Sequence, residues 1–262
     1  MTGWPVYVIN MDENPDRMAR ARAELDRLGI AFTRFSAVNG RAIPEDEVPR
    51  VYDADANARR FRHPMIGAEI GCYLSHVALW ERIAAGDAPG GIVLEDDFAA
   101  RDSLPAVLDA LARDGDAWDI VKLFSLDKPQ RLLDRRPLVV GAAGGDGAAG
   151  GAEIVIPYKV PTTMLGYAIR KDTAARLAAG ALPVSRPVDE DHKHFWELGL
   201  RIASVLPPPL QFGETSFEEG SIQKTRRRSR GVAGLAQAGR NLRYRLRYVA
   251  GLHWHRLVRR AR

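Results

Sequence analysis

The sequence is poor in cysteine and in long apolar runs, and each scarcity excludes a class of protein. Only one cysteine, Cys72, stands among the 262 residues, which excludes an intramolecular disulfide and a cysteine-based zinc site and favours a reducing compartment. No run approaches the ~18 apolar residues of a transmembrane helix. The first five residues carry neither a basic cluster nor an apolar run, so we expect no secretory signal and a cytoplasmic protein.

Three glycine-containing motifs are also absent. The first apolar run is not followed by Gly-x-Gly-x-x-Gly, and neither a phosphate-binding Gly-x-x-x-x-Gly-Lys-Ser/Thr loop nor a Gly-x-Ser-x-Gly elbow occurs. These absences argue against dinucleotide enzymes, P-loop nucleotidases and serine hydrolases of the elbow type. Apolar residues make up 46% of the chain and charged residues 27%, which is ordinary for a globular protein.

The net charge of +5 conceals two oppositely charged parts. Residues 224–262 hold 13 of the 38 lysines and arginines and none of the 33 acids, so residues 1–223 carry 25 basic against 33 acidic side chains. We therefore expect an acidic body, residues 1–223, and a basic, helical C-terminal tail, residues 224–262. The high isoelectric point belongs to the tail.

Apolar periodicity predicts an α/β fold for the body. A strand at 5–10, a helix that follows Asn14-Pro15 and ends at Gly29, and a strand at 31–36 are typical of the start of a parallel sheet. The further predicted elements are helices at 67–85, 104–112, 172–179 and 189–198 and strands at 91–94, 118–124, 164–169 and 201–205. Residues 41–66 show no clean periodicity, and the glycine-rich stretch 141–151 is interpreted as a flexible insertion, with a lid as the alternative.

An acidic triplet, Glu95-Asp96-Asp97, directly follows the apolar strand at 91–94. Ligands of open α/β sheets bind at the carboxyl ends of the strands. Three adjacent carboxylates repel one another and are offset by a cation, and oxygen ligands suit Mg²⁺ and Mn²⁺, which bind pyrophosphate. The alternative is a solvated acidic turn.

A second acidic cluster, Asp189-Glu190-Asp191, opens the helix predicted at 189–198. An Asp near a substrate hydroxyl is a competent general base. Acids in a first helical turn also stabilise the helix dipole, and the pattern alone favours this structural interpretation. Ser75-His76 lacks the setting of a nucleophilic triad and is better suited to hydrogen bonding.

The tail alternates arginine with aromatic and aliphatic residues between Leu242 and Leu257. Such a segment is typical of binding to an anionic bilayer surface. A solvated tail is the second interpretation, and nucleic acid, whose phosphates and bases also suit arginine and aromatics, is the least favoured.

Taken in chain order, the motifs resemble glycosyltransferase family 25, the group that contains lipooligosaccharide β-galactosyltransferases and collagen galactosyltransferases. The two segments most specific as a pair are Gly71-Cys72-Tyr73-Leu74-Ser75-His76 and Leu94-Glu95-Asp96-Asp97. The resemblance also includes Val8-Ile9-Asn10 with Asp16-Arg17, residues 35–40, Thr163 to Ile169 and Pro187-Val188-Asp189. Asn39 stands where the family more usually has aspartate, and residues 125–160 match nothing in the family pattern.

The resemblance implies a GT-A-like, mostly parallel α/β fold and an inverting transfer of a sugar, typically galactose, from a UDP-sugar. Carried onto this chain, Glu95 and Asp97 become ligands of Mn²⁺ or Mg²⁺, with Asp97 foremost. The implied donor-binding residues are Asn10, Arg17, Ser75, His76 and Asp96, and the implied general base is Asp189, with Asp191 second.

The expected acceptor is a hydroxyl of a cell-surface glycan, such as lipooligosaccharide or another lipid-linked or capsular glycan. We therefore expect a cytoplasmic enzyme that is peripheral at the inner face of the cell membrane. Two alternatives from other classes stay open. One is a glycoside hydrolase that uses two carboxylates without nucleotide or metal, and the other is a non-catalytic glycan-binding scaffold of the same fold.

Overall fold

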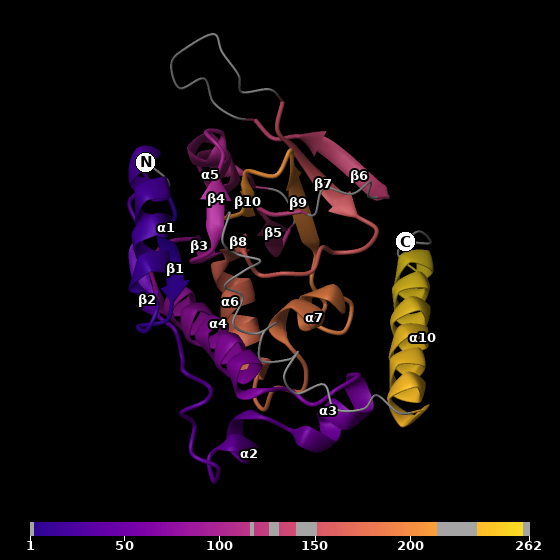
Figure 1. Cartoon of the computed structure of the whole chain (residues 1–262). Coiled ribbons are helices and arrows are strands. Elements are labelled where there is room, and N and C mark those ends of the chain that lie inside the picture. The colour runs from indigo at the N-terminus through magenta and orange to yellow at the C-terminus, as the bar shows by residue number, and fades with distance from the viewer. Residues whose placement is uncertain (1–2, 116–117, 126–130, 140–150, 214–234, 259–262) are drawn as a thin grey trace.

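The computed structural model describes residues 3–115, 118–125, 131–139, 151–213 and 235–258 (Figure 1). Its helices are α1 (Pro15–Arg27), α2 (Val48–Val51), α3 (Ala54–Arg60), α4 (Gly67–Ala85), α5 (Leu104–Arg113), α6 (Lys171–Gly180), α7 (Val188–Lys193) and α10 (Leu235–Val258). Its strands are β1 (Val6–Asn10), β2 (Thr33–Ser36), β3 (Gly90–Glu95), β4 (Phe98–Ala100), β5 (Ile120–Lys122), β6 (Leu132–Pro137), β7 (Glu153–Pro157), β8 (Gly166–Arg170), β9 (Ile202–Leu206) and β10 (Leu210–Phe212). Within these ranges, no helix is long and apolar enough to span a bilayer.

Eight strands form one sheet in the order β2-β1-β3-β8-β5-β9-β7-β6, and β10 and β4 form a separate pair. The pairing directions place β2, β1, β3, β5, β9 and β6 in one orientation and β8 and β7 in the other. The prediction of an α/β fold with a mostly parallel central sheet is therefore confirmed. Antiparallel β8 between β3 and β5 was not predicted, because strand direction is set by tertiary pairing.

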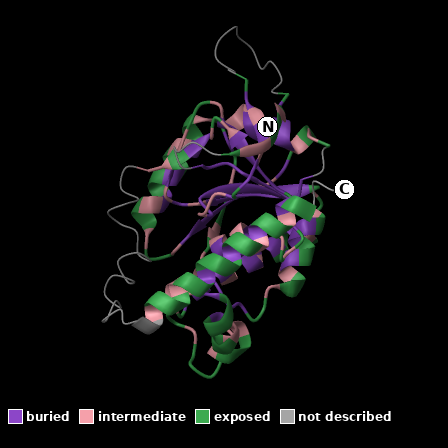
Figure 2. Ribbon diagram, turned by 90° about the vertical axis from the view of Figure 1, so that its right-hand side faces the viewer, coloured by how far each residue is buried: buried purple, intermediate pink, exposed green. Residues whose placement is uncertain are grey.

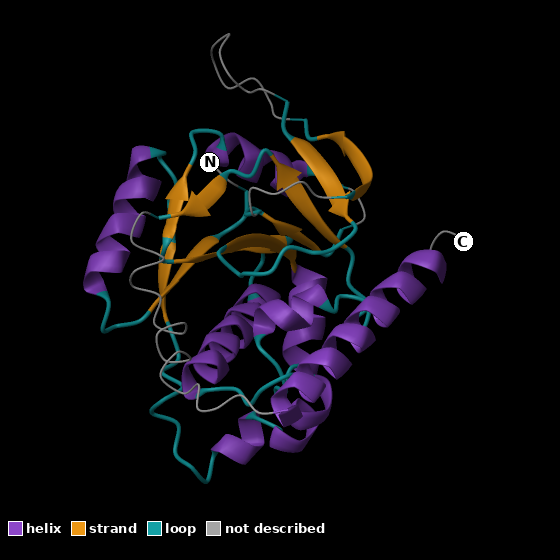
Figure 3. Cartoon of the chain, turned by 45° about the vertical axis from the view of Figure 1, so that its right-hand side comes forward, coloured by secondary structure: helices purple, strands orange, loops and turns teal. Residues whose placement is uncertain are grey.

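Helices cover both faces of the sheet (Figure 3). β1 is buried on both faces: Val8 joins one apolar cluster with α1 and α5, and Ile9 joins the other with α4, α6 and α7. A strand buried on both faces reads as a continuous apolar run, as this one does. The carboxyl ends of β1 and β3 lie side by side, since Ile9 pairs with Glu95.

Agreement with the predicted elements is closest for α4 and β3. α4 has a long apolar stripe that ends before Gly86, and β3 is an uninterrupted buried run. The helix predicted at 189–198 ends at Lys193 instead, and the chain turns again before Gly199, whose φ of +61° lies in the left-handed region that suits glycine.

Several elements escaped prediction. Residues 41–66, for which no element was predicted, hold the short helices α2 and α3. Strand β6, which is rich in charged residues, pairs with β7, although residues 138–152 separate the two strands in the sequence. Two predictions fall outside the described residues: the character of the glycine-rich stretch, of which only Gly151 is described, and the boundary between residues 223 and 224. The described part of the tail is helix α10, and its Tyr248 and Leu252 belong to the apolar cluster on the α4 side.

Candidate active site

The acidic triplet lies where the sequence predicts: Glu95 ends β3 beside the end of β1, and Asp96 and Asp97 form the turn to β4. Asn10, the last residue of β1, donates from Nδ2 to Asp96 Oδ2 over 2.6 Å. Arg17, in the first turns of α1, reaches Asp96 Oδ1 at 2.5 Å and Asp97 Oδ2 at 3.2 Å. Four predicted site residues from three segments of the chain therefore converge here, and Arg17 supplies part of the expected positive charge.

One guanidinium does not neutralise the triplet. Burial raises the pKa of Glu95 to about 7, and the charge of Asp96 adds to the rise. Burial and then the charge of Glu95 raise the pKa of Asp97 to about 7 as well, against the opposing effect of Arg17. Burial also raises the pKa of Asp96, although Arg17 and Asn10 oppose it. The negative charge of the triplet is therefore only partly compensated by Arg17.

The donor atoms suit a hard divalent cation. Glu95 and Asp97 are 29% and 20% exposed, so their carboxylates border the protein surface, and carboxylate oxygens are the ligands that Mg²⁺ and Mn²⁺ prefer. Cys72 Sγ, a ring nitrogen of His76 and a Glu95 oxygen also lie within 4.8 Å of one another, a set that could hold a metal ion. Glu95 belongs to both sets.

His76 approaches Glu95 from α4 and is held by a buried hydrogen-bond chain. Trp80 Nε1 donates to Tyr167 Oη at 2.9 Å, and Tyr167 Oη lies 2.8 Å from His76 Nδ1. Because Trp80 donates to the Tyr167 oxygen, the Tyr167 proton can point to Nδ1, which leaves the imidazole proton on Nε2. That atom faces Glu95 Oε1 at 3.7 Å. Burial, with the charge of Lys122, lowers the pKa of His76 to about 3, so the ring is neutral.

Ser75 is engaged within the protein. Its hydroxyl donates to Gly71 O and accepts from Val38 N, both at 2.8 Å. The chain after β2 and helix α4 touch closely here: a Cβ on Gly71 would lie 2.4 Å from Gly40 N, so only glycine fits. Ser75 thus fixes this loop against α4, and its contact with a donor stays a prediction.

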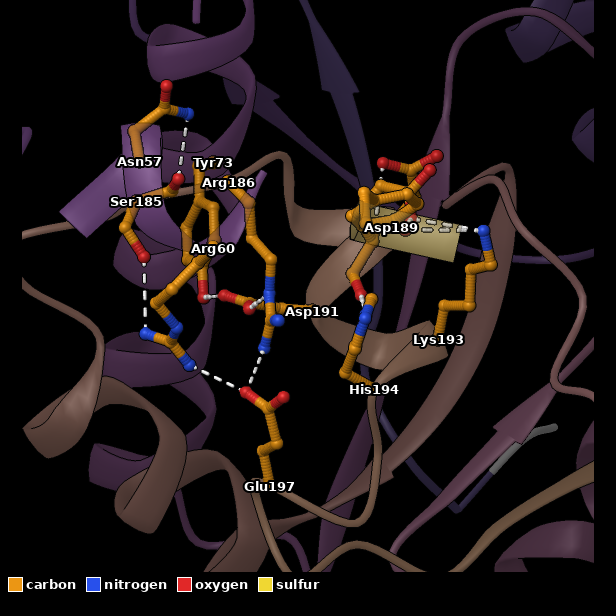
Figure 4. A network of polar contacts seen from close by, with 12 residues as sticks. Asn57, Arg60, Tyr73, Ser185, Arg186, Asp189, Asp191, Lys193, His194 and Glu197 are labelled. Carbon is orange, nitrogen blue, oxygen red and sulfur yellow. Dashed lines mark hydrogen bonds and ion pairs between the residues drawn. The ribbon is translucent and has the colours of Figure 1, made fainter. Parts of the chain in front are cut away.

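The second acidic cluster divides into two paired acids and one without an ion pair. Asp191 accepts from buried Arg186 and, at 2.6 Å, from Tyr73 Oη. Glu190 pairs with Lys193 at 3.2 Å and Arg62 at 3.3 Å. Figure 4 shows Asp191 between Tyr73 and Arg186, with Glu197 bridging Arg186 and Arg60.

Asp189, by contrast, makes no ion pair with the described residues. Its Oδ1 accepts from Glu190 N at 2.9 Å. Burial, the charge of Glu190 and, more weakly, Glu95 raise the pKa of Asp189, and Lys122 opposes the rise. The charge of Glu95 thus acts on Asp189 across the two acidic clusters. A carboxylate with a raised pKa and no bound counter-ion suits proton abstraction, as the first-choice base requires.

Lys122, at the end of β5, was missed by sequence analysis. It is 1% exposed, and its Nζ donates to Thr163 O at 2.9 Å. Burial lowers the pKa of Lys122 to about 8, although the charges of Asp189 and Glu95 oppose this. Lys122 therefore interacts with both clusters. The available signal was a lysine in the middle of the mainly apolar strand predicted at 118–124, which also contains Asp119.

Thr163, which accepts from Lys122, has a φ of +84°, unusual for a β-branched residue. Such strained backbone is concentrated at functional sites, because the surrounding structure must hold it. Thr163 lies in the segment that precedes β8, within the motif 163–169.

Comparison with known proteins supports the family resemblance that the sequence motifs indicated. A family model described as "Glycosyltransferase family 25 (LPS biosynthesis protein)" matches residues 4–132. The chain is 32% identical over 252 residues to a "Glycosyltransferase 25 family member" of Anopheles gambiae, which covers 84% of this chain and 38% of that protein.

Two further relatives differ in stated activity. "Procollagen galactosyltransferase 1-B" of Xenopus laevis is 27% identical over 250 residues, covering 84% of this chain and 38% of that protein. "Inactive glycosyltransferase 25 family member 3" of Homo sapiens is 27% identical over 228 residues, covering 77% and 35%. The chain thus spans less than two fifths of the length of these relatives. By the matched family model and these relatives, the chain belongs to glycosyltransferase family 25.

Proposed function

We propose that this protein is an inverting glycosyltransferase with a GT-A-like fold. It transfers a sugar, foremost galactose, from a UDP-sugar to a hydroxyl of a cell-surface glycan such as lipooligosaccharide or another lipid-linked or capsular glycan. Galactose is supported by the relative named as a procollagen galactosyltransferase. The observation that carries the proposal is the contrast between Asp191, which is paired with Arg186, and Asp189, which makes no ion pair with the described residues and whose pKa is raised by burial and by the charges of Glu190 and Glu95.

The residues have separate duties in this mechanism. Asp189 accepts the proton of the acceptor hydroxyl while the hydroxyl oxygen attacks the anomeric carbon. The bond from that carbon to the diphosphate oxygen breaks at the same time, with inversion. Mn²⁺ or Mg²⁺ held by Glu95 and Asp97 would neutralise charge on the leaving diphosphate. Asn10 and Arg17 hold Asp96, and His76 faces Glu95, so these residues order the donor side of the site.

Substitution of Asp189 tests the assignment of the base. Asp189→Asn is expected to retain UDP-sugar binding and lower kcat at least a hundredfold, because general-base catalysis contributes about 10² to 10⁴ in rate. Exposed Asp46→Asn is the matched control and should behave as wild type. Wild-type kcat in Asp189→Asn would contradict the mechanism.

Calorimetric titration of UDP-galactose, UDP-glucose and UDP, with Mn²⁺ and then with EDTA, tests the donor. Metal-dependent binding of a UDP-sugar is expected. Because one relative carries the word inactive in its name, a glycan-binding scaffold is the second candidate, and it would bind glycan without turnover of any donor. Cleavage of glycan in EDTA without nucleotide would instead identify a hydrolase.

A further inference from the structure

Helix α10 has an inner face that is fixed to the body. Tyr244, Tyr248, Leu252 and Arg256 recur every four residues and are 6%, 8%, 1% and 8% exposed. Tyr244 Oη donates to Glu190 in α7, and Arg256 Nη2 donates to Pro157 O at 2.7 Å. The two tyrosines of α10 are therefore packed against the body and are not available to a partner, whereas Trp254 is exposed.

The outer face of α10 carries most of the exposed apolar surface of the described residues. Of eight large apolar side chains that are exposed there, six lie on this helix: Leu242, Leu246, Val249, Trp254, Leu257 and Val258. Leu242, Leu246, Val249 and Leu257 fall on one stripe at the helical repeat of 3.6 residues. In Figure 2, α10 crosses the viewed face with its exposed side turned outward.

Arginines border this stripe on both sides. At 100° per residue, Arg243 and Arg247 lie along one border and Arg245 along the other. Arg243 and Arg247 also donate to the carbonyl oxygens of Ala58 and Arg59 in α3, at 2.9 and 2.8 Å, so their charges are held beside the stripe. Residues 235–258 contain no acid. The surface is therefore both apolar and cationic.

We propose that this outer face, defined by Leu242, Leu246, Val249, Trp254 and Leu257, docks on the surface of an anionic lipid bilayer. A folded helix with an apolar stripe bordered by arginines matches the headgroup boundary, where aliphatic groups enter the acyl region and cations meet phosphates. Contacts to α3 and α7 hold the helix before it meets lipid. The proposal is independent of the chemical step, so it can fail while the proposed transfer stands.

Vesicle sedimentation of the full chain tests the proposal. Wild type is expected to bind phosphatidylcholine vesicles with 30% phosphatidylglycerol at least tenfold more tightly than pure phosphatidylcholine, since each arginine contributes near an anionic surface. The triple variant Leu242→Gln, Leu246→Gln, Leu257→Gln should lose at least tenfold of this affinity at unchanged charge. Because these side chains already face water, its unfolding midpoint should equal that of wild type.

The chain offers a matched control. Val139 and Leu182, 82% and 47% exposed, are the other two exposed large apolar residues in the described ranges and lie off α10. The double variant Val139→Gln, Leu182→Gln should therefore bind as wild type. Equal loss in this control, equal binding of neutral and anionic vesicles, or undiminished binding of the triple variant would each overturn the proposal.

Tryptophan fluorescence gives a second readout. The chain has five tryptophans, and only Trp254 is exposed, at 72%. Anionic vesicles that contain brominated acyl chains should quench wild-type emission, and Trp254→Phe should remove that quenching. Absence of quenching would overturn the proposal. It would also be overturned if wild type bound no vesicles and formed a dimer that the triple variant did not form, and the face would then be assigned to self-association.

Discussion

Glu95→Gln should stabilise the metal-free protein, and the gain should depend on pH. The carboxyl of Glu95 is forced to a pKa of about 7 by burial and by Asp96, from an ordinary value of 4.5. A folded-state pKa above the unfolded one means that the folded protein binds more protons between these values, so stability falls as pH rises from 4.5 to 7. The charged form therefore costs most above pH 7, and glutamine removes that cost.

The size of the effect follows from the shift. At about 1.4 kcal/mol per pH unit, a carboxylate raised from 4.5 to about 7 costs about 3 kcal/mol at pH 8 and about 1 kcal/mol at pH 5. Part of this cost is shared with Asp97, and the side chain is 29% exposed, so we expect a measured gain of about 1 to 3 kcal/mol at pH 8.

Urea unfolding in EDTA at pH 8 and at pH 5 measures the gain. Exposed Asp46→Asn is the control and should change stability by less than about 0.5 kcal/mol at either pH. In a second series, Mn²⁺ should stabilise wild type at pH 8 more than Glu95→Gln, because a ligand stabilises only the state that binds it. A gain that is as large at pH 5 as at pH 8, or a loss at pH 8, would refute the electrostatic reasoning.

Three further substitutions probe Lys122, the ion pair of the second acidic cluster and the hydrogen bonds of Ser75. Lys122→Met removes a buried cation that holds the pKa of Asp189 down, so the acidic limb of the kcat–pH profile should move to higher pH; an unmoved limb would contradict this. Arg186→Met leaves Asp191 buried without its cation and should cost about 3–5 kcal/mol in urea unfolding, part of which Asp191→Asn should restore. Ser75→Ala should cost about 1–3 kcal/mol, because two hydrogen bonds to backbone are lost, and a protein as stable as wild type would show that the loop needs no such anchor.

The parts of the fold that were predictable are those whose sequence pattern and tertiary setting agree. α4 matches its prediction because its apolar stripe faces the sheet and Gly86 ends it. β6 was not predictable, because its residues are half exposed and charged and its partner β7 begins only at Glu153. The reversed direction of β8 was not predictable either, since its own sequence is compatible with both orientations.

The site residues that could be predicted are those whose role depends on adjacent residues in the sequence and on the strand that they follow. The triplet at the end of β3 and its proximity to Asn10 follow from strand order at one sheet edge. The difference between Asp189 and Asp191 does not, because it depends on Arg186 and on Tyr73 in α4, 118 residues away from Asp191. The sequence pattern alone favoured a structural role for Asp189, Glu190 and Asp191. The ion pair of Asp191 with Arg186 is consistent with that role for Asp191.

The distribution of counter-ions gives the acidic residues two kinds of role. A buried charge is costly unless it is paired. Two acids of α7 are paired in this way: Asp191 with Arg186, which precedes the helix, and Glu190 with Lys193, while Tyr244 of α10 donates a hydrogen bond to Glu190. A carboxylate fixed in this way is poorly able to exchange its partner for a metal ion or a proton.

The charges of Glu95, Asp97 and Asp189 are less fully compensated, although Arg17 forms an ion pair with Asp97. Burial raises the pKa of each of them, and the cations that oppose this, Arg17 and Lys122, leave the repulsion between the acids incompletely compensated. This repulsion lowers the free energy of unfolding of the metal-free protein. A divalent cation bound to Glu95 and Asp97, or a proton taken by Asp189 from the acceptor, would reduce the repulsion. The same repulsion that makes Glu95→Gln stabilising is therefore the reason to expect that variant to be a poor enzyme.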